Sequence, residues 1–361
     1  MKRLSILLLI CALSLAAAER HARNVILFLG DAGGIPVLNA ASILAHNAPL
    51  KLFVQHMPHI GLSETSSASE WVTDSAAGMT AIVTGEKTDN GVLSMTAMGK
   101  DGGERKPLKT ILEYAEEHGL ATGVMSNMMM ADATPAACYS HVDQRSKFGE
   151  IFAQVLTPLF GDGVDLIVGP GRREIFDTTA KLGVDLAPEL ARKGYRLYDA
   201  ADKIGPDDRR VIALFDSGDY DINAAVQRAI TVLSHNQKGY FLMVEWDMHT
   251  DDVRRGLKHA VEMDSLVRET AGTVGDDTLV LFTADHSFDF RVKGGRKDEP
   301  LLPESLTAPM DNVAVQNTHT GEEVLVAAQG PGSEGVHGYL FNTDLFHIML
   351  AAYGWEPPRA K

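Results

Sequence analysis

Asn24-Val-Ile-Leu-Phe-Leu-Gly30, followed by Asp31, is the stretch that decides the fold of this chain. It is a short, continuous apolar run, which is typical of a strand buried on both faces of a parallel sheet. Similar runs span 121–125, 165–168, 211–214, 240–244, 278–283 and 323–328. Segments with helical spacing separate them, at 36–46, 75–83, 108–118, 224–234 and 252–271. This alternation predicts a single three-layer α/β domain with a mostly parallel central sheet and helices on both faces.

Polar residues with metal-binding side chains follow the ends of several of these runs. Asp31 follows the first run, Glu245 closes the run at 240–244, and Asp285 and His286 follow the run at 278–283. Thr134 lies about ten residues past the run at 121–125. Parallel α/β sheets collect their chemistry at the carboxyl ends of the strands. Acids and histidines gathered there have the composition of a metal site.

A serine, Ser75, begins the predicted helix at 75–83. A helix N-terminus offers free N–H groups and a positive dipole end to a phosphate or an oxyanion. The alternative interpretation is that Ser75 merely caps this helix. The G-x-S-x-G motif of the α/β-hydrolases is missing from Thr73-Asp-Ser-Ala-Ala77. A nucleophilic serine here would therefore need another activator, and metal coordination is one.

Composition and the N-terminal segment restrict the classes of function. The chain has 361 residues and a formal net charge of -15, which argues against nucleic-acid binding by a basic patch. Residues 1–18 have two basic residues, an apolar stretch and an Ala-Ala-Ala end, which predicts a cleaved signal peptide and a mature domain at 19–361. Because that stretch is too short to span a membrane and no later one is longer, we expect a periplasmic or secreted protein without a transmembrane segment.

These motifs resemble those of the alkaline phosphatase family of metal-dependent phosphomonoesterases, in the family's order and over nearly the whole mature chain. The matching segments are 24–31, Val72-Thr-Asp-Ser-Ala-Ala-Gly78, 84–90, Ala133-Thr-Pro-Ala-Ala137, Arg145, Thr283-Ala-Asp-His-Ser287 and His319-Thr-Gly-Glu322. The resemblance implies hydrolysis of small phosphate monoesters through a phosphoserine on Ser75, with Arg145 holding two phosphate oxygens. It also implies a homodimer.

The resemblance further implies two zinc ions and one magnesium ion. Asp31, Asp285 and His286 would bind one zinc, and His319 would bind the second together with ligands from 245–252. Asp31, Thr134 and Glu245 would bind the magnesium. These residue types suit the ions, because zinc takes histidine and carboxylate ligands and magnesium prefers oxygen ligands.

The segment Glu245-Trp-Asp-Met-His249 departs from the family's pattern, which places the histidine four residues after the aspartate. Here Asp247 and His249 are separated by one residue, and we interpret them as ligands of the second zinc. They could reach one ion only from an extended or turned backbone, since on a helix they would face apart. Asp251 is the alternative ligand, and Asp251 or Asp252 could instead cap the helix that follows.

Three further expectations remain open at this point. Segments 85–103 and 291–317 are expected to be loops, and the short stretch at 287–318 leaves little room for a large crown-like insertion. Asp132 is either an acid near the magnesium site or a solvated loop residue. The alternative functions are a phosphodiesterase of the same superfamily and a catalytically weak metal- or phosphate-binding protein.

Overall fold

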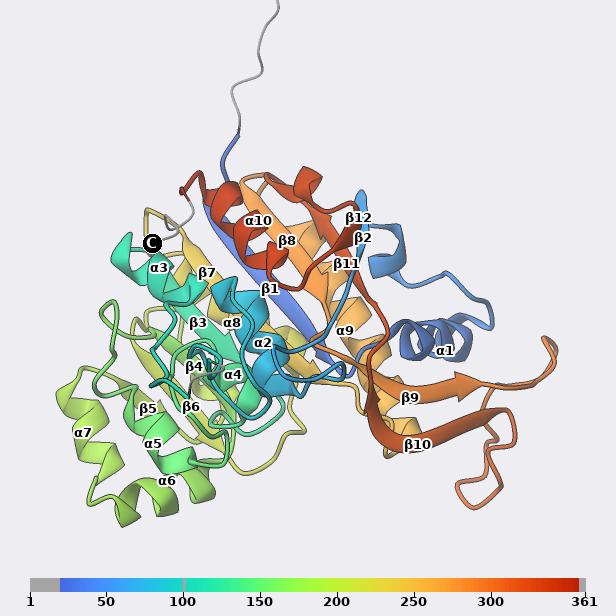
Figure 1. Ribbon diagram of the computed structural model, residues 1–361, viewed down its shortest axis with the longest axis horizontal. Coiled ribbons are helices and arrows are strands. Elements are labelled where there is room, and N and C mark those ends of the chain that lie inside the picture. The colour runs from blue at the N-terminus through green and yellow to red at the C-terminus, as the bar shows by residue number, and fades with distance from the viewer. Residues whose placement is uncertain (1–19, 100–101, 357–361) are drawn as a thin grey trace, which may run out of the picture.

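One large sheet organises the described part of the chain, residues 20–99 and 102–356 of the computed structural model. Its strands are β1 (Asn24–Asp31), β2 (His59–Ser63), β3 (Ala121–Met125), β4 (Leu166–Pro170), β5 (Arg196–Tyr198), β6 (Val211–Phe215), β7 (Tyr240–Asp247), β8 (Thr278–Thr283), β11 (Val324–Gln329) and β12 (Gly338–Leu340). Their order is β12-β2-β11-β8-β1-β7-β3-β4-β6-β5 (Figure 1). All pairs are parallel except those of β11 with β2 and β8. The seven predicted strands are confirmed, whereas the predicted signal peptide at 1–18 lies outside the described residues.

Helices cover both faces of this sheet, as predicted. They are α1 (Ile35–His46), η1 (Phe53–His56), α2 (Ser75–Thr84), α3 (Ile111–Glu117), α4 (Ala133–Ala136), α5 (Phe148–Ala153), α6 (Arg172–Lys181), α7 (Leu186–Arg192), η2 (Ala201–Lys203), α8 (Ile222–Leu233), α9 (Val253–Thr273), η3 (Ser333–Gly335) and α10 (Asp344–Tyr353). Among the described residues, no helix is long and apolar enough to cross a membrane.

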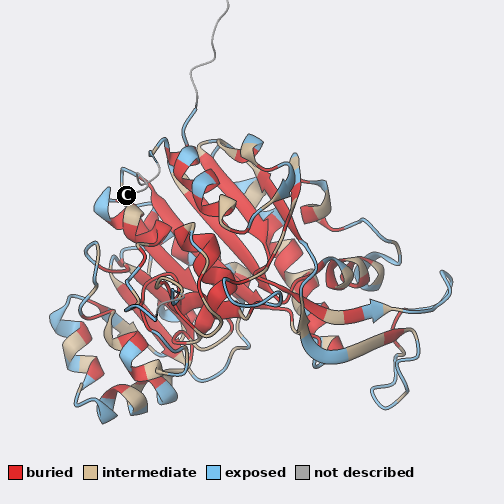
Figure 2. Ribbon diagram, viewed as in Figure 1, coloured by how far each residue is buried: buried red, intermediate tan, exposed pale blue. Residues whose placement is uncertain are grey.

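Two apolar cores, one on each face, explain why the central strands are buried (Figure 2). In β1, Leu27 and Leu29 pack into the core beneath α2, α3 and α10, whereas Ile26 and Phe28 pack into the core beneath α1, α8 and α9. All four side chains are fully buried. Because side chains alternate between the faces of a strand, a strand covered on both sides must be apolar at every position. The continuous apolar runs of the sequence follow from this.

The prediction of a loop at 291–317 was partly wrong. Strands β9 (Ser287–Val292) and β10 (Val313–Thr320) form an antiparallel pair that projects from the main sheet (Figure 1). Phe288, Phe290 and Val313 are buried, while charged residues occupy intervening positions. A strand with one solvated face alternates polar and apolar residues, so its signal is weaker than that of a continuous apolar run.

Candidate active site

The site forms at the edge of the sheet where the parallel strands end, which we call the carboxyl edge. Asp31 and Asp247 are the last residues of β1 and β7 and stand opposite each other in the strand register. Asp285 and His286 lie two and three residues after the end of β8, the other neighbour of β1. Three neighbouring strands therefore deliver these four residues to one place. All four are buried. His249, from the segment after β7, and His319, within β10, join them and are partly exposed.

Ser75 enters this cluster from the first turn of α2. Its Oγ lies 3.2 Å from His286 Nε2. The interpretation of Ser75 as the helix cap was wrong, because the N-cap is Asp74, whose carboxylate accepts a hydrogen bond from the Ala77 N–H. The serine hydroxyl is therefore not used in capping. It faces the histidine at the positive end of the helix.

Close packing holds α2 against the strand end. A Cβ on Gly78 would lie 2.9 Å from the carbonyl oxygen of Asp285, which is shorter than any normal contact. Glycine is therefore required for α2 to approach the segment that carries Asp285 and His286. The small residues after Ser75 thus serve the geometry of the site.

The first group of candidate ligands consists of Asp31, Asp285 and His286. His286 Nε2 lies 3.2 Å from Asp31 Oδ1 and 3.5 Å from Asp285 Oδ2. Burial and the neighbouring Asp31 raise the pKa of Asp285 to about 6. Burial alone would raise the pKa of Asp31 too, but His249 and His286 hold it well below its ordinary value. Both effects show closely spaced charges with little water around them.

A second group contains His249, His286 and His319. His249 Nδ1 lies 2.8 Å from Asp247 Oδ1, and His319 Nδ1 lies 3.0 Å from the Thr73 carbonyl oxygen. Since a carbonyl oxygen only accepts, His319 Nδ1 must donate, which leaves its Nε2 with a free lone pair. The two Nε2 atoms of His249 and His319 face each other at 3.5 Å.

The structure separates the two alternatives for the segment after β7. Asp247 and His249 lie in the cluster and form a third group with Asp31. Asp251 instead forms an ion pair with Arg255 at 2.7 Å on the surface. Asp252 caps α9 by accepting hydrogen bonds from the N–H groups of Arg254 and Arg255. The extended backbone at the end of β7 allows the short Asp-x-His spacing to converge on one place.

Glu245 is close to Asp31 and to the Thr134 side chain. Burial and the charge of Asp31 raise the pKa of Glu245 well above its ordinary value, while hydrogen bonds from the Ser126 and Thr134 side chains oppose this shift. Ser126 donates its hydroxyl hydrogen bond to Glu245. Ser126 directly follows the apolar run at 121–125 but is not among the residues predicted for the site.

Arg145 bridges two carboxylates at the mouth of the site. Its Nη1 donates to Asp74 Oδ2 at 3.1 Å and its Nη2 donates to Asp132 Oδ1 at 2.9 Å. Asp132 also caps α4, so it is neither a free loop acid nor a member of the candidate metal groups among the described residues. The two acids hold the guanidinium in place, and its side chain remains 31% exposed.

The comparisons with known proteins agree with this geometry. The alkaline phosphatase family profile matches residues 22–305. The alkaline phosphatase of Escherichia coli (strain K12) is 28% identical over 95% of this chain and 88% of its own length. Alkaline phosphatase H of Pseudomonas aeruginosa is 29% identical over 94% of this chain and 87% of its own. The crystal structure of Thermus thermophilus alkaline phosphatase has a similar fold, with a TM-score of 0.79 and 22% identity over 94% of this chain and 92% of that chain.

The chain belongs to the alkaline phosphatase family. Members named among its relatives are phosphoric monoester hydrolases, and this is the enzyme class of the chain. The structure of the alkaline phosphatase from the Antarctic bacterium TAB5 extends the agreement in fold, with a TM-score of 0.76 and 24% identity over 94% of this chain and 99% of that one. The family match ends at residue 305, before His319, whereas the sequence match to the Escherichia coli enzyme covers 95% of this chain.

The residues of this family member fit divalent cations. Asp31 Oδ1 and Asp285 Oδ2 are buried and have no hydrogen-bond partner among the described residues. A tetrahedral zinc with bonds of about 2.0–2.1 Å sets its ligand atoms roughly 3.4 Å apart, close to the separation of the His249 and His319 Nε2 atoms. Although burial alone would lower the pKa of His249, Asp31 and Asp247 raise it to about 9. The acids therefore favour a positive charge at this place, which a divalent cation would also supply.

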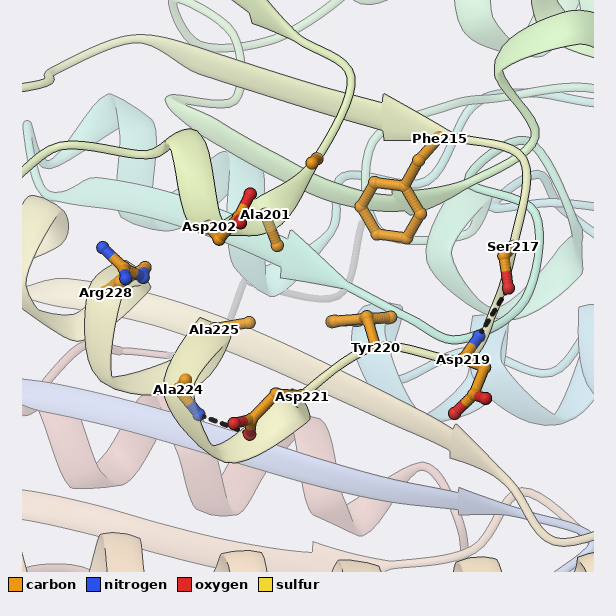
Figure 3. A pocket seen from close by; sticks show the side chains of 11 residues that line it. Ala201, Asp202, Phe215, Ser217, Asp219, Tyr220, Asp221, Ala224, Ala225 and Arg228 are labelled. Carbon is orange, nitrogen blue, oxygen red and sulfur yellow. Dashed lines mark hydrogen bonds between the residues drawn. The ribbon is translucent and has the colours of Figure 1, made fainter.

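Two hollows lie away from the serine in this alkaline phosphatase. One, of 520 Å³, is lined by Phe215, Tyr220 and Arg228 and contains none of the predicted site residues (Figure 3). A cleft of 830 Å³ shares Tyr220 with the first hollow and is also lined by Trp246, Asp247 and His259. Since Trp246 packs into the core of α1, α8 and α9, this cleft lies on the opposite face of the sheet from α2.

Proposed function

We propose that the chain is an exported, metal-dependent phosphomonoesterase that hydrolyses small phosphate monoesters through a phosphoserine on Ser75. The observation that carries the proposal is the 3.2 Å contact of Ser75 Oγ with His286 Nε2 inside the cluster of buried acids and histidines. Residues 1–18 would direct export to the periplasm or the medium and be removed, leaving the catalytic domain at 19–361. A homodimer is the assembly that the family resemblance suggests.

Three cations are proposed, with ligands taken from the groups described above. Asp31, Asp285 and His286 would hold one zinc, and Asp247, His249 and His319 would hold the second. Asp31, Thr134 and Glu245 would hold a magnesium. Bound cations would supply Lewis-acid charge that favours an ionised nucleophile and stabilises the entering and leaving oxygens of an in-line displacement.

The side chains of the protein account for the other parts of the reaction. Ser75 Oγ forms a bond to phosphorus while the bond from phosphorus to the ester oxygen breaks and the alcohol leaves. Water then attacks the phosphoserine, which releases inorganic phosphate and restores Ser75. Arg145, held by Asp74 and Asp132, can donate from two nitrogens to two phosphate oxygens. The first N–H groups of α2 add donors at the positive end of the helix dipole.

Hydrolysis of p-nitrophenyl phosphate by the purified mature protein, with zinc and magnesium, tests the proposal. Wild type should be active, Ser75→Ala should be inactive, and Ser234→Ala, an exposed serine at the end of α8, should match wild type. Chelation should abolish the activity. An inactive wild type with bound metal would contradict the proposal and favour a binding role, and faster turnover of bis-p-nitrophenyl phosphate would favour a phosphodiesterase.

A further inference from the structure

The backbone of Asp247 is held at both its N–H and its carbonyl oxygen by side chains that the family motifs do not include. Its N–H donates to Asn127 Oδ1 at 2.8 Å, and its carbonyl oxygen lies 2.6 Å from His259 Nδ1. Since a carbonyl oxygen only accepts, His259 must donate from Nδ1. Asn127 comes from the segment after β3 and His259 from α9, so two separate elements meet at this one residue.

Helix α9 is built to approach the segment that follows β7. A Cβ on Gly256 would lie 2.3 Å from the carbonyl oxygen of His249, so only glycine lets the helix pack this closely. One turn further on, the His259 ring packs edge-to-face on Trp246 with centroids 5.7 Å apart. The Trp246 Nε1–H donates to Glu262 Oε2 at 3.2 Å, which ties the tryptophan to the same helix.

Asp247 in turn orients His249. Its Oδ1 accepts hydrogen bonds from the backbone N–H of His249 at 3.0 Å and from His249 Nδ1 at 2.8 Å. This leaves His249 Nε2 facing His319. A change in the backbone conformation of Asp247 would therefore move the side chains of both candidate ligands, Asp247 and His249. Only one residue separates Asp247 from His249, so the local backbone by itself does little to fix the positions of both side chains.

We propose that His259 and Asn127 are positioning residues that hold the backbone of Asp247 and thereby preorganise the second zinc site. The inference rests on the proposed function, because it assigns Asp247 and His249 to that site. Among the described residues, neither His259 nor Asn127 hydrogen-bonds Ser75 or belongs to a candidate metal group. Groups that orient metal ligands typically change metal affinity by about 10–100-fold when they are removed. We expect an effect of this size on one zinc, with the other zinc and Ser75 left intact.

Zinc affinity, measured by competition with a chelator on mature protein, separates this role from a general structural one. His259→Leu removes the donor at similar volume and should weaken one zinc by about 10–100-fold. His259→Asn, whose amide can donate near the Nδ1 position, should retain wild-type affinity. Lys258→Ala is the matched control, because this neighbour is exposed and pairs with Glu262. Saturating zinc should restore the kcat of His259→Leu.

Asn127→Ala tests the hydrogen bond at the N–H of the same residue, Asp247, and should weaken the same zinc. Equal zinc affinity in His259→Leu and wild type would overturn the proposal. So would a loss of stability in the metal-free protein without any change in zinc affinity, which would show a purely structural role. A wild type that binds no zinc, or whose hydrolysis does not need Ser75, would instead contradict the proposed function.

Discussion

Both edges of the central sheet bury carboxylates, but the two groups are arranged differently. At the carboxyl edge, Asp31 and Asp285 keep buried oxygens without hydrogen-bond partners among the described residues. Strands β3 and β4 begin at the opposite edge, which we call the amino edge. There Glu116 accepts hydrogen bonds from the Gly163 N–H and the Thr122 hydroxyl. Asp165 at the same edge accepts one from the Thr122 N–H.

The charges of the two groups are also balanced by different means. Histidines surround the acids of the carboxyl edge, and two carboxylate oxygens there lack a hydrogen-bond partner among the described residues, an arrangement that suits a cation. Burial raises the pKa of Glu116 to about 8, so a proton neutralises this acid at neutral pH. Burial raises the pKa of Asp165 only to about 6, and its carboxylate lies 3.9 Å from the Nε of Arg210. Buried acids therefore indicate a metal site only where histidines converge and oxygens stay unpaired. The predictions below test this distinction.

Asp31→Ala should have the largest effect, because Asp31 belongs to two of the candidate ligand groups. Loss of Lewis-acid stabilisation worth several kcal/mol should lower kcat by roughly 10³-fold or more. Metal content, measured by elemental analysis, should fall together with activity. Asp165→Asn removes a buried charge from the amino edge and should leave both quantities unchanged. A metal-replete and active Asp31→Ala variant would refute the assignment.

Arg145→Lys should reduce activity less. A lysine has a single ammonium group and cannot replace the two-point contact of the guanidinium with phosphate. The kcat/KM for p-nitrophenyl phosphate should fall by about 10²-fold, the loss typical of removing one preorganised donor. Arg210→Lys, which alters the arginine beside Asp165, is the matched control and should keep wild-type kcat/KM. Equal effects of the two substitutions would contradict a specific role of Arg145.

Glu116→Gln should change the pH dependence of stability but not activity. The folded protein keeps a proton on Glu116 up to a pKa of about 8, whereas its ordinary value is 4.5. The unfolded chain releases that proton at lower pH, so Glu116 makes wild type lose stability as pH rises between these values. Glutamine removes this slope, and the stability of the variant relative to wild type should rise by about 1–3 kcal/mol from pH 5 to pH 8.5.

Urea unfolding at several pH values measures this effect. Glu117→Gln is the control, because Glu117 is a partly exposed neighbour that pairs with Lys109. That variant should keep the slope of wild type. A parallel pH profile for Glu116→Gln and wild type would show that Glu116 is ionised in the folded protein at neutral pH.

Ala32→Gly should have the smallest effect. Ala32 has a φ of 62°, which is costly for a residue with a Cβ, and it directly follows Asp31. Glycine removes about 1–2 kcal/mol of strain but loses about 0.5–1 kcal/mol through the greater freedom of the unfolded chain. The net gain in the free energy of unfolding should be below about 1 kcal/mol. A clear loss would show that the Ala32 methyl group contributes packing that outweighs the strain.

The amino edge meets the same backbone requirement with glycine. Gly161 and Gly163, in the loop over Glu116, have φ values of 68° and 92°. Gly163→Ala should therefore destabilise the protein, in contrast to the change at Ala32. Ala32, with its strained backbone, thus lies beside the candidate ligand Asp31. Strained conformations are commonly found at such sites.

The sequence by itself determined the main strands and the residues that follow them. A strand covered on both faces must be apolar throughout, so β1, β7 and β8 were visible as continuous runs. Their carboxyl ends necessarily meet at one edge of a parallel sheet, which explains why Asp31, Glu245 and Asp285 could be selected before any geometry was known. Local composition is sufficient for such inferences, because each depends on one segment and one rule.

Only the tertiary structure decided which nearby polar groups meet. It placed Asp247 and His249 in the site and Asp251 on the surface, and it made Asp74 rather than Ser75 the cap of α2. It also placed Asn127 at the N–H and His259 at the carbonyl oxygen of Asp247. Such contacts join residues far apart in the chain or depend on the exact path of a turn, and hydrogen bonds form only over about 3 Å. Sequence patterns predict the ends of elements to within a few residues, so the partners of each side chain follow from packing alone.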